Sequence, residues 1–564
     1  MPQRKLTKSY IHQPCDTPLE GNTVADYLDL AAELFPDRDA LVFIKDGTRK
    51  TFAQLHRDVN DLAAGLLQFG LHCGDNVGIW AEENYQWLVT DFAVSTAGCT
   101  SVRFPVNSTP ERLRHLLKKV NCKVLVIGSI HTNPVHILSE IIPSFEFYSE
   151  KVINCEGIPN LKHIISMSPT NHPSIIQLCD VINLGKNDKK EEILKEAKHA
   201  TDSDSSYAIV FTSGSTGDRK AVALRHRRLQ YAALQMEYQF GYTGEKRDSE
   251  RIITNHVNDF TSGMHTMAES LMLTLGATVV FPHPNTTEGI LDAVQREKCN
   301  LLNAFPMNLS EISNAIDISK YDVSSIVNVI CTGGTVPLTI LNKVAREMQC
   351  NIELIYSSLE CAAIALNKSS IPLEDKISTY GSPAPYYEIK VTDLTTGRIT
   401  PVGVPGQICV RSPFLLKEYV GDKELTTSAK SGEGWFRTGD SGKLDERGVL
   451  KVMGRTDDVI IKGGINIYPA EVEQIVCQNP KIKLHQVVGV PDEQFVNELC
   501  LCVVLHDSTT STESELKDYF TGKLDDFRLP KYILFLKEFP MTETNKIKRN
   551  DLAKLAAKML HLEK

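Results

Sequence analysis

The sequence predicts an α/β protein with a large N-terminal domain, made of several subdomains with layered sheets, followed by a small α+β domain. Helical periodicity alternates with short β-branched runs along most of the 564 residues, which is typical of layered α/β folds. At roughly 150 residues per domain, this length corresponds to three or four structural units. The pattern changes near Gly454, so we expect an N-terminal domain of residues 1–454 and a C-terminal domain of residues 455–564.

Composition and charge exclude several other classes of protein. The chain has 42% hydrophobic and 23% charged residues, which is close to the average for soluble globular proteins. The net charge is −9 and the isoelectric point is about 6.0, so the chain lacks the basic character of proteins that bind nucleic acids. No apolar run reaches the ~18 residues of a membrane-spanning helix. We expect no nucleic-acid partner and no integral membrane segment.

Cysteine usage and the N-terminal residues bear on the compartment. The 14 cysteines are scattered without metal-ligand spacing, which favours buried thiols and a reducing environment. Cys500 and Cys502 stand two apart in an apolar run, so they should face the same side of a strand. The first residues are basic but have no apolar core, which is unlike a secretory signal and compatible with a weak organellar presequence. We expect an intracellular protein, cytoplasmic or mitochondrial.

Local patterns predict the elements of the two domains in order. In the N-terminal domain they are a helix over 26–34, a hairpin of 40–44 and 50–52 around Asp46-Gly47, buried strands at 77–80 and 124–127, and a charged surface helix and loop within 185–204. Strand-and-turn patterns then cover 405–411, 434–440 and 448–454. In the C-terminal domain they are a helix over 470–477, strands at 486–490 and 498–505, and a helix that begins at Ser514.

A segment rich in glycine and hydroxyl groups follows an apolar strand predicted over residues 207–211. It reads Thr212-Ser-Gly-Ser-Thr-Gly-Asp-Arg-Lys220. Glycines let backbone N–H groups approach phosphate oxygens, hydroxyls donate hydrogen bonds, and the Lys220 ammonium neutralises charge. The segment is not a Walker loop, because Asp218 and Arg219 separate Gly217 from Lys220. It indicates a phosphate-binding loop of another kind.

This loop resembles the signature of the adenylate-forming superfamily, which comprises acyl-CoA synthetases, peptide-synthetase adenylation domains and beetle luciferases. Other motifs follow in the superfamily's order: Gly333-Gly-Thr335, Tyr356-Ser-Ser-Leu-Glu360, Trp435-Phe-Arg-Thr-Gly-Asp440, the hinge segment Gly454-Arg-Thr-Asp-Asp458 running to Gly464 and Asn466, and the terminal segment Pro540 to Arg549. The resemblance covers essentially the whole chain and is closest to mitochondrial medium-chain fatty acyl-CoA synthetases. It implies that the small C-terminal domain is mobile.

The resemblance implies a two-step chemistry that uses ATP, Mg²⁺ and CoA. A carboxylate attacks the α-phosphate of ATP, and CoA then takes the acyl group from the adenylate. The catalytic residues so implied are Lys546, Glu360 and Lys220, and Glu360 is the expected ligand of Mg²⁺. The implied nucleotide-binding residues are Thr212, Ser213, Gly214, Ser215, Thr216, Gly217, Lys220, Gly333, Gly334, Thr335, Tyr356, Asp440, Arg455 and Lys546. Asp457 resembles the hinge, and Gly464 lies where the family's thioester-forming state lines the CoA tunnel.

Several positions depart from the superfamily pattern. Ser357 and Leu359 replace a glycine and a threonine, and Arg219 replaces the usual proline of the phosphate loop. Loss of the threonine hydroxyl removes a donor near the α-phosphate, which typically costs ~1–3 kcal/mol where the acceptor is buried. These changes raise the question of whether the substrate is a simple aliphatic acid.

The segment that lines the carboxylate pocket in the family also departs from its pattern. Asp259, preceded by Asn258, aligns with the family's histidine, and a shift of a few residues in the alignment would bring His256 there instead. A carboxylate is repelled by the carboxylate of a fatty acid unless its charge is neutralised. Asp259 therefore predicts poor activity on saturated medium-chain acids.

Three functions agree with these observations. The first is an ATP-dependent acid–CoA ligase, which the full set of motifs favours. The second is an ATP-dependent luciferase that oxidises an activated luciferin with light emission, because recruitment to that task would remodel the pocket. The third is a degenerate nucleotide-binding relative, against which stand the intact residues Lys220, Glu360, Asp440, Arg455 and Lys546. The expected partner is a small carboxylic acid or a luciferin, and the oligomeric state is not determined.

Overall fold

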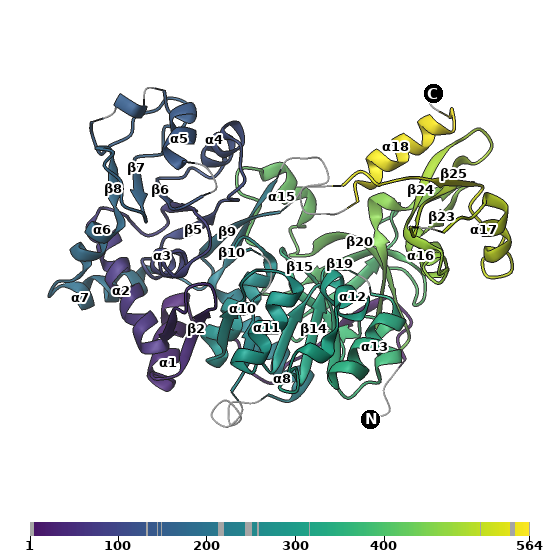
Figure 1. Ribbon diagram of the computed structural model, residues 1–564, viewed down its shortest axis with the longest axis horizontal. Coiled ribbons are helices and arrows are strands. Elements are labelled where there is room, and N and C mark those ends of the chain that lie inside the picture. The colour runs from purple at the N-terminus through teal and green to yellow at the C-terminus, as the bar shows by residue number, and fades with distance from the viewer. Residues whose placement is uncertain are drawn as a thin grey trace. The chain divides into compact units, whose positions relative to one another are not determined.

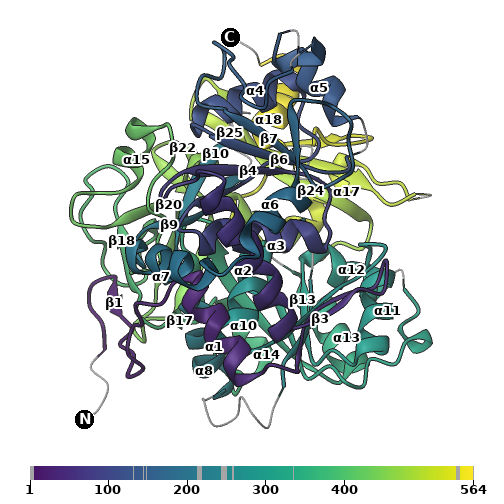
Figure 2. The ribbon, with the colours of Figure 1, turned by 90° about the vertical axis from the view of Figure 1, so that its left-hand side faces the viewer.

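The computed structural model describes residues 5–130, 133–143, 145–147, 149–212, 219–242, 251–256, 259–314, 316–334, 336–507, 509–541 and 547–562. Its elements are drawn in Figures 1 and 2. Internal contacts divide the chain into two units. The large unit comprises His12–Tyr387 and Arg411–Gly434, and the small unit comprises Met1–Ile11, Glu388–Val410 and Trp435–Lys564.

The first sheet of the large unit is parallel except for one edge strand. Its order is β10-β9-β5-β4-β6-β7-β8, and β10 is antiparallel to β9. The strands are β4 (Asn76–Trp80), β5 (Thr100–Arg103), β6 (Val124–Ile127), β7 (His163–Ser166), β8 (Ile175–Gln177), β9 (Ser206–Thr212) and β10 (Lys220–Arg225). Strands β5 and β6 are buried throughout, as expected of parallel strands that helices cover on both faces.

The second sheet of the large unit has a parallel centre and antiparallel strands at both ends. Its order is β17-β16-β15-β14-β13-β11-β12-β2-β3. The strands are β2 (Asp39–Phe43), β3 (Arg49–Thr51), β11 (Ile253–Asn255), β12 (Thr278–Phe281), β13 (Leu301–Ala304), β14 (Asn328–Thr332), β15 (Asn351–Ser358), β16 (Ala362–Leu366) and β17 (Ser382–Pro383). The carboxyl ends of the parallel strands are where ligands bind in open α/β sheets.

Helices of the large unit cover these sheets. They are α1 (Val24–Leu34), α2 (Phe52–Gln68), α3 (Tyr85–Thr96), α4 (Pro110–Lys119), α5 (Pro134–Ile141), α6 (Leu178–Gly185), α7 (Lys190–Ala200), α8 (Tyr231–Phe240), α10 (Gly263–Leu275), α11 (Thr287–Glu297), α12 (Pro306–Asn314), α13 (Leu338–Met348), α14 (Leu373–Ser378) and α15 (Lys423–Ala429). Helices α1, α2 and α3 contact one another (Figure 2), and α12 and α13 pack on strands beside β14 (Figure 1).

Local sequence signals account for the starts of several of these helices. Thr23 and Thr51 each form a capping box with the third residue of α1 and α2, and Asn84 caps α3. Helix α4 begins at Pro110, directly after the capping residue Thr109. These caps satisfy backbone N–H groups that a helix leaves unpaired at its first turn.

The small unit contains two further sheets. One has the order β1-β18-β19-β20-β21, and the other has β23-β22-β25-β24 with β26 paired to β25. The strands are β1 (Tyr10–His12), β18 (Glu388–Thr392), β19 (Gly406–Arg411), β20 (Phe436–Leu444), β21 (Leu450–Arg455), β22 (Ile460–Lys462), β23 (Ile465–Ile467), β24 (Ile482–Asp492), β25 (Val496–Leu505) and β26 (Tyr532–Phe535). The helices are α16 (Pro469–Val476), α17 (Glu513–Phe520) and α18 (Arg549–Met559).

The α/β fold class and most elements predicted from the sequence are confirmed. Helices α1 and α7, strands β4 and β6, and the β2–β3 hairpin lie where the patterns placed them. All 14 cysteines are among the described residues, none forms a disulfide, and Cys500 and Cys502 face one apolar cluster. In the described part of the chain no helix combines the length and apolarity needed to cross a bilayer.

Internal contacts group the sheet before Gly454 with the residues that follow it. Residues 388–410 and 435–454 belong to the same unit as the C-terminal residues, and helix α16 contacts strand β21. The expected boundary between residues 1–454 and 455–564 rests on the change of sequence pattern near Gly454 and on the mobility that the resemblance implies, and these contacts do not test it. It therefore stays a prediction.

Candidate active site

Strands β9 and β10 place two predicted phosphate ligands opposite each other. Thr212 is the last residue of β9, Lys220 is the first of β10, and the two are direct partners in the antiparallel pair. Residues 213–219 therefore connect the end of β9 to the start of its neighbouring strand β10. Ser213, Gly214, Ser215, Thr216 and Gly217 lie outside the described residues.

One tyrosine joins Lys220 to the predicted magnesium ligand. The Lys220 ammonium lies 5.5 Å from the centre of the Tyr419 ring. The hydroxyl of Tyr419 donates a hydrogen bond of 3.0 Å to the Oε1 atom of Glu360. Tyr419 is buried, so this arrangement is part of the packed interior of the large unit. The sequence motifs did not single out Tyr419.

The backbone around Tyr419 ties the two sheets of the large unit together. The N–H groups of Lys417 and Val420 donate to the carbonyls of Ala223 and Ala221 on β10, each at 2.8 Å. The N–H of Leu416 donates to the carbonyl of Glu360, which follows β15, at 2.7 Å. Residues 416–420 thus fix the edge of the first sheet against the turn between β15 and β16.

The predicted adenine-side residues follow β14 and end β15. Gly333 has φ +91°, a conformation that favours glycine, and a Cβ there would crowd the Phe305 ring at 3.1 Å. Tyr356 is buried on β15 and makes an aromatic contact with Tyr380. Gly334 is close to Pro306. Thr335 lies outside the described residues.

The serine that replaces a family glycine has a partner in the structure. The hydroxyl oxygen of Ser357 lies 2.6 Å from that of Thr332 at the end of β14, and the Thr332 hydroxyl also lies 3.1 Å from the Ile355 carbonyl. Leu359, which replaces a threonine, would lie 3.9 Å from a Cβ at Gly263, the first residue of α10. The two replacements therefore pack against neighbouring elements.

In the small unit, Asp440 and Arg455 are held together by the β20–β21 hairpin. They are direct partners in the antiparallel pair, and the Nη1 atom of Arg455 lies 3.1 Å from Oδ1 of Asp440. Arg455 also donates to the carbonyl of Thr438, whose hydroxyl accepts from the Asp440 N–H. Gly439 has φ +74°, and a Cβ there would meet the Arg455 guanidinium at 2.6 Å. The hairpin therefore restrains both predicted nucleotide ligands.

The predicted catalytic Lys546 lies outside the described residues. Met541 and Ile547, which flank residues 542–546 in the sequence, form an antiparallel bridge. Arg549, at the start of α18, forms ion pairs with Glu473 at 3.1 Å and with Asp458 at 3.5 Å. Burial raises the pKa of Glu473, against the charge of Arg549. These pairs anchor the start of α18 to α16 and to the turn that contains Asp457.

Asp259, from which the sequence analysis predicts poor activity on saturated acids, is an exposed turn residue. Its Oδ1 accepts hydrogen bonds from the backbone N–H and the hydroxyl of Thr261 at 3.1 and 2.7 Å. His256 is buried at the end of β11, and its Nε2 lies 3.0 Å from Nδ1 of His265. Asn258 lies outside the described residues. The turn gives the Asp259 carboxylate a structural role that requires no substrate.

A carboxylate from the first sheet holds the same turn. The backbone N–H of Phe260 donates to Oε1 of Glu83, which lies between β4 and α3, at 2.7 Å. Burial, with a smaller effect from the charge of Asp259, raises the pKa of Glu83 to about 8, although the hydrogen bond from Phe260 acts in the opposite direction. The Phe260 ring also packs edge-on against Trp87 of α3 at 4.9 Å. Glu83 and Trp87 therefore fix the turn after β11 to the other sheet.

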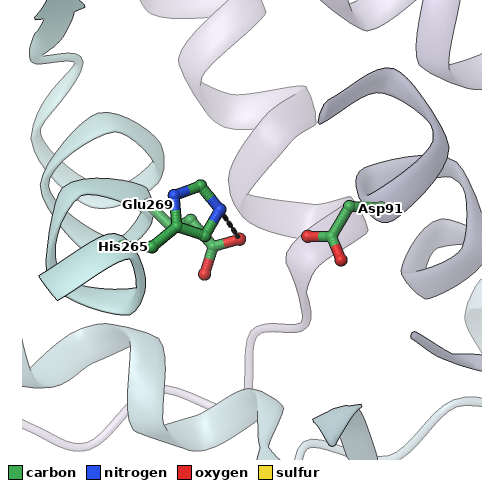
Figure 3. A group of neighbouring side chains, drawn as sticks. All are labelled: Asp91, His265 and Glu269. Carbon is green, nitrogen blue, oxygen red and sulfur yellow. Dashed lines mark ion pairs between the residues drawn. The ribbon is translucent and has the colours of Figure 1, made fainter. Parts of the chain in front are cut away.

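The structure also brings together a buried polar cluster that the sequence did not reveal. Asp91 of α3 faces His265 and Glu269 of α10, and a dashed line marks the ion pair of the last two (Figure 3). Arg103 of β5 makes ion pairs of 2.7 Å with Asp91 and 2.5 Å with Glu269. The only signal in the sequence was a few charged residues inside apolar runs.

Three of these side chains offer ligand atoms within 4.8 Å of one another, the spacing of a metal site. The guanidinium of Arg103 already supplies a positive charge to both carboxylates. Burial lowers the pKa of His265, and the charge of Arg103 lowers it further, whereas Asp91 acts in the opposite direction. The cluster is therefore a buried ion-pair network, and we assign no metal to it.

Comparison with known proteins gives two family matches. Residues 28–420 match the protein family "AMP-binding enzyme". Residues 471–546 match the family "AMP-binding enzyme C-terminal domain". A medium-chain acyl-CoA ligase of Danio rerio, ACSF2, mitochondrial, is 33% identical over 99% of this chain and 92% of its own length. Together the two matches include the strand of Lys220 and the segment of Lys546.

Solved structures share the fold at low sequence identity. An anthranilate CoA ligase, AuaEII, in complex with anthranoyl-AMP, has a TM-score of 0.79 at 22% identity over 96% of this chain and 99% of that one. ATP-bound MatB from Rhodopseudomonas palustris has a TM-score of 0.77 at 20% identity, over 95% of this chain and 99% of that one. These likenesses establish the fold class.

Proposed function

Because this chain belongs to the family of AMP-binding enzymes and is an adenylate-forming enzyme like the acyl-CoA synthetases, we propose that it joins a medium-chain carboxylic acid to CoA. In the first step a carboxylate oxygen bonds to the α-phosphorus of ATP, and pyrophosphate leaves. In the second step the sulfur of CoA bonds to the acyl carbon, AMP leaves, and the thiol proton is released. The observation that carries the proposal is the contact chain from Lys220 through Tyr419 to Glu360.

The residues of the large unit suit the first step. Lys220 and Thr212 stand side by side at the two ends of the phosphate loop, where a cation and a hydroxyl can hold the leaving pyrophosphate. Negative charge grows on the phosphate oxygens in the transition state, so a fixed ammonium lowers the barrier. In this proposal Lys220 and Thr212 bind the β- and γ-phosphates.

The donor set around Glu360 fits Mg²⁺. A nucleotide-bound Mg²⁺ is usually held by one or two carboxylates together with phosphate oxygens. Glu360 supplies one carboxylate, which Tyr419 orients by a hydrogen bond to one of its two oxygens. When bound, Mg²⁺ neutralises charge on the phosphates. We propose that Glu360 holds it.

The small unit supplies the remaining proposed ligands. Asp440 accepts hydrogen bonds from the ribose hydroxyls, and Arg455, its partner, lies on the ribose or phosphate side. Lys546 joins the α-phosphate to the substrate carboxylate in the first step. A long, flexible side chain with a point charge suits that task. Gly464, with φ +83° in the β22–β23 turn, belongs to the surface that meets CoA in the second step.

We propose a medium-chain acid and a mitochondrial location because the Danio rerio relative is a mitochondrial medium-chain acyl-CoA ligase. The turn role of Asp259 accounts for its carboxylate without a polar substrate, which supports an aliphatic acid. The relatives are acyl-CoA ligases, so we prefer the ligase over the luciferase.

The test is a screen of pyrophosphate release with straight-chain acids of graded length, aromatic acids and luciferins, each with and without CoA. We expect CoA-dependent turnover to be fastest with a medium-chain acid. Lys546→Ala should reduce adenylate formation by roughly 10²-fold or more, the effect of losing a transition-state contact. Lys548→Ala is the matched control, because it removes an exposed lysine two residues away. Unchanged pyrophosphate release by Lys546→Ala, or light emission with a luciferin, would contradict the proposal.

A further inference from the structure

Tyr419 contacts a predicted catalytic group from each of the two sheets of the large unit. Its hydroxyl donates to Oε1 of Glu360, which follows β15 of the second sheet. The face of its ring receives the ammonium of Lys220, the first residue of β10 in the first sheet. One side chain therefore connects the proposed metal ligand with the proposed phosphate ligand.

The protein holds Tyr419 in one position through its backbone and its burial. Tyr419 forms a β-bridge with Val222 of β10, and its N–H donates to the hydroxyl of Thr426 on α15 at 3.0 Å. The residue is only 4% exposed. Asp422 caps α15 and so fixes the helix that carries Thr426. Contacts within the protein thus orient the ring and the hydroxyl.

We propose that Tyr419 is a positioning residue that orients Glu360 for the metal and Lys220 for the phosphates. This inference rests on the proposed function. The hydroxyl hydrogen bond occupies one side of Oε1 and restricts rotation of the Glu360 carboxylate, so its remaining lone pairs face a fixed direction. The ring attracts the Lys220 ammonium through its negative face, which keeps that long side chain beside the phosphate loop. A carboxylate and a lysine on separate sheets thereby keep a constant spacing.

Two substitutions separate the two roles. Tyr419→Phe removes the hydroxyl and keeps the ring and its volume, so it tests the link to Glu360 alone. Tyr419→Leu removes the ring as well, so it also tests the link to Lys220. Tyr386→Phe is the matched control, because it removes a tyrosine hydroxyl that donates to the backbone carbonyl of Thr17 in the same unit.

The readout is direct binding, without turnover. In the first experiment Mn²⁺, which replaces Mg²⁺, is added to the protein saturated with a non-hydrolysable ATP analogue, and electron paramagnetic resonance measures its binding. In the second, calorimetry measures binding of the analogue alone in the presence of a chelator. We expect Tyr419→Phe to weaken Mn²⁺ binding about tenfold, the effect of losing one charge-assisted hydrogen bond, and to leave metal-free binding of the analogue unchanged. Tyr419→Leu should weaken both.

A double-substitution cycle distinguishes positioning from loss of folding. In a protein that carries Glu360→Gln, adding Tyr419→Phe should weaken Mn²⁺ binding no further, because the group that Tyr419 orients is already altered. Mn²⁺ binding by Tyr419→Phe equal to that of the unmodified protein would overturn the inference while leaving the proposed function intact. Failure of the unmodified protein to bind Mn²⁺ with the analogue would instead overturn the proposed function. Equal weakening by Tyr386→Phe would also reject the inference.

Discussion

At the residue scale, Asp440 is held in place by its own hairpin. The ion pair with Arg455 and the hydrogen bond from its N–H to Thr438 restrict the side chain and the backbone. Arg455 is about half exposed, at 53%, so the pair adds little to stability. Its effect is to orient a carboxylate that can accept two hydroxyl donors.

Asp440→Asn should raise the KM for ATP because the amide has one acceptor oxygen and no charge. Loss of a hydrogen bond to a charged group costs about 1.5–3 kcal/mol, which corresponds to roughly 10- to 100-fold in KM. Initial rates of pyrophosphate release at varied ATP measure this change. Glu446→Gln, in the loop of the same hairpin, removes an exposed acid and is the control. A KM for ATP that does not change would remove Asp440 from the nucleotide site.

Glu83 should make stability depend on pH. Its pKa is about 8 in the folded protein and near 4.5 when unfolded, so the folded state binds the proton more tightly. The protonated Glu83 therefore contributes fully to the free energy of unfolding below pH 4.5. This contribution is lost as the pH rises toward 8 and Glu83 ionises.

Glu83→Gln, which still accepts the Phe260 N–H, should be more stable than the unmodified protein at pH 8 by on the order of 2 kcal/mol and similar to it at pH 5. Urea unfolding at both pH values measures the difference, and Glu82→Gln controls for net charge. Parallel pH profiles of the two proteins would contradict the shifted pKa.

At the element scale, the buried ion-pair network of Asp91, Arg103, His265 and Glu269 joins α3, β5 and α10. It therefore connects elements in and beside the first sheet to a helix beside the second sheet. Arg103 is completely buried and lies between two carboxylates. Replacing a whole buried ion pair by apolar groups can be neutral, whereas removing one partner leaves an uncompensated charge. The network therefore specifies how these elements pack more than it adds stability.

Arg103→Met should destabilise the protein by about 3–5 kcal/mol, because Asp91 and Glu269 lose their counter-charge. Chemical denaturation followed by circular dichroism measures the loss. The triple variant Arg103→Met with Asp91→Asn and Glu269→Gln should recover part of it. Arg296→Met, which breaks an exposed pair on α11, should change stability by less than about 1 kcal/mol. A loss no larger in Arg103→Met than in Arg296→Met would mean that the buried pairs carry no structural role.

At the scale of the whole molecule, the proposed ligands are divided between the two units. Thr212, Lys220 and Glu360 belong to the large unit, whereas Asp440, Arg455 and Lys546 belong to the small unit. Two half-reactions need different groups, since Lys546 serves the first and the Gly464 surface serves the second. We therefore expect the residues after Asp457 to rotate between the steps.

Asp457→Pro should separate the two steps. Asp457 is an exposed residue of the 3₁₀ turn Thr456–Asp458, and proline fixes its φ angle. We expect adenylate formation to survive and thioester formation to fail, which single-turnover assays of each step would detect. Asp457→Ala, which leaves φ free, is the control and should retain both. Equal loss of both steps in the proline variant would indicate misfolding rather than a trapped state.

The sequence by itself determined the fold class, most elements and the order of the nucleotide motifs. These features depend on local patterns, such as apolar periodicity, capping residues and the glycine-rich segment after β9. The strand that ends at Thr212 is of this kind, because a continuous apolar run forms it.

Only the tertiary structure decided the partners that are distant in the sequence. Glu360 meets Tyr419, Glu83 meets Phe260, and Arg103 meets Glu269 across 59, 177 and 166 positions of the chain. No local pattern encodes such pairs, because each depends on how two sheets pack and on which polar groups their burial leaves in need of a partner. The same structure shows that Asp259 is an exposed residue whose carboxylate accepts hydrogen bonds from Thr261.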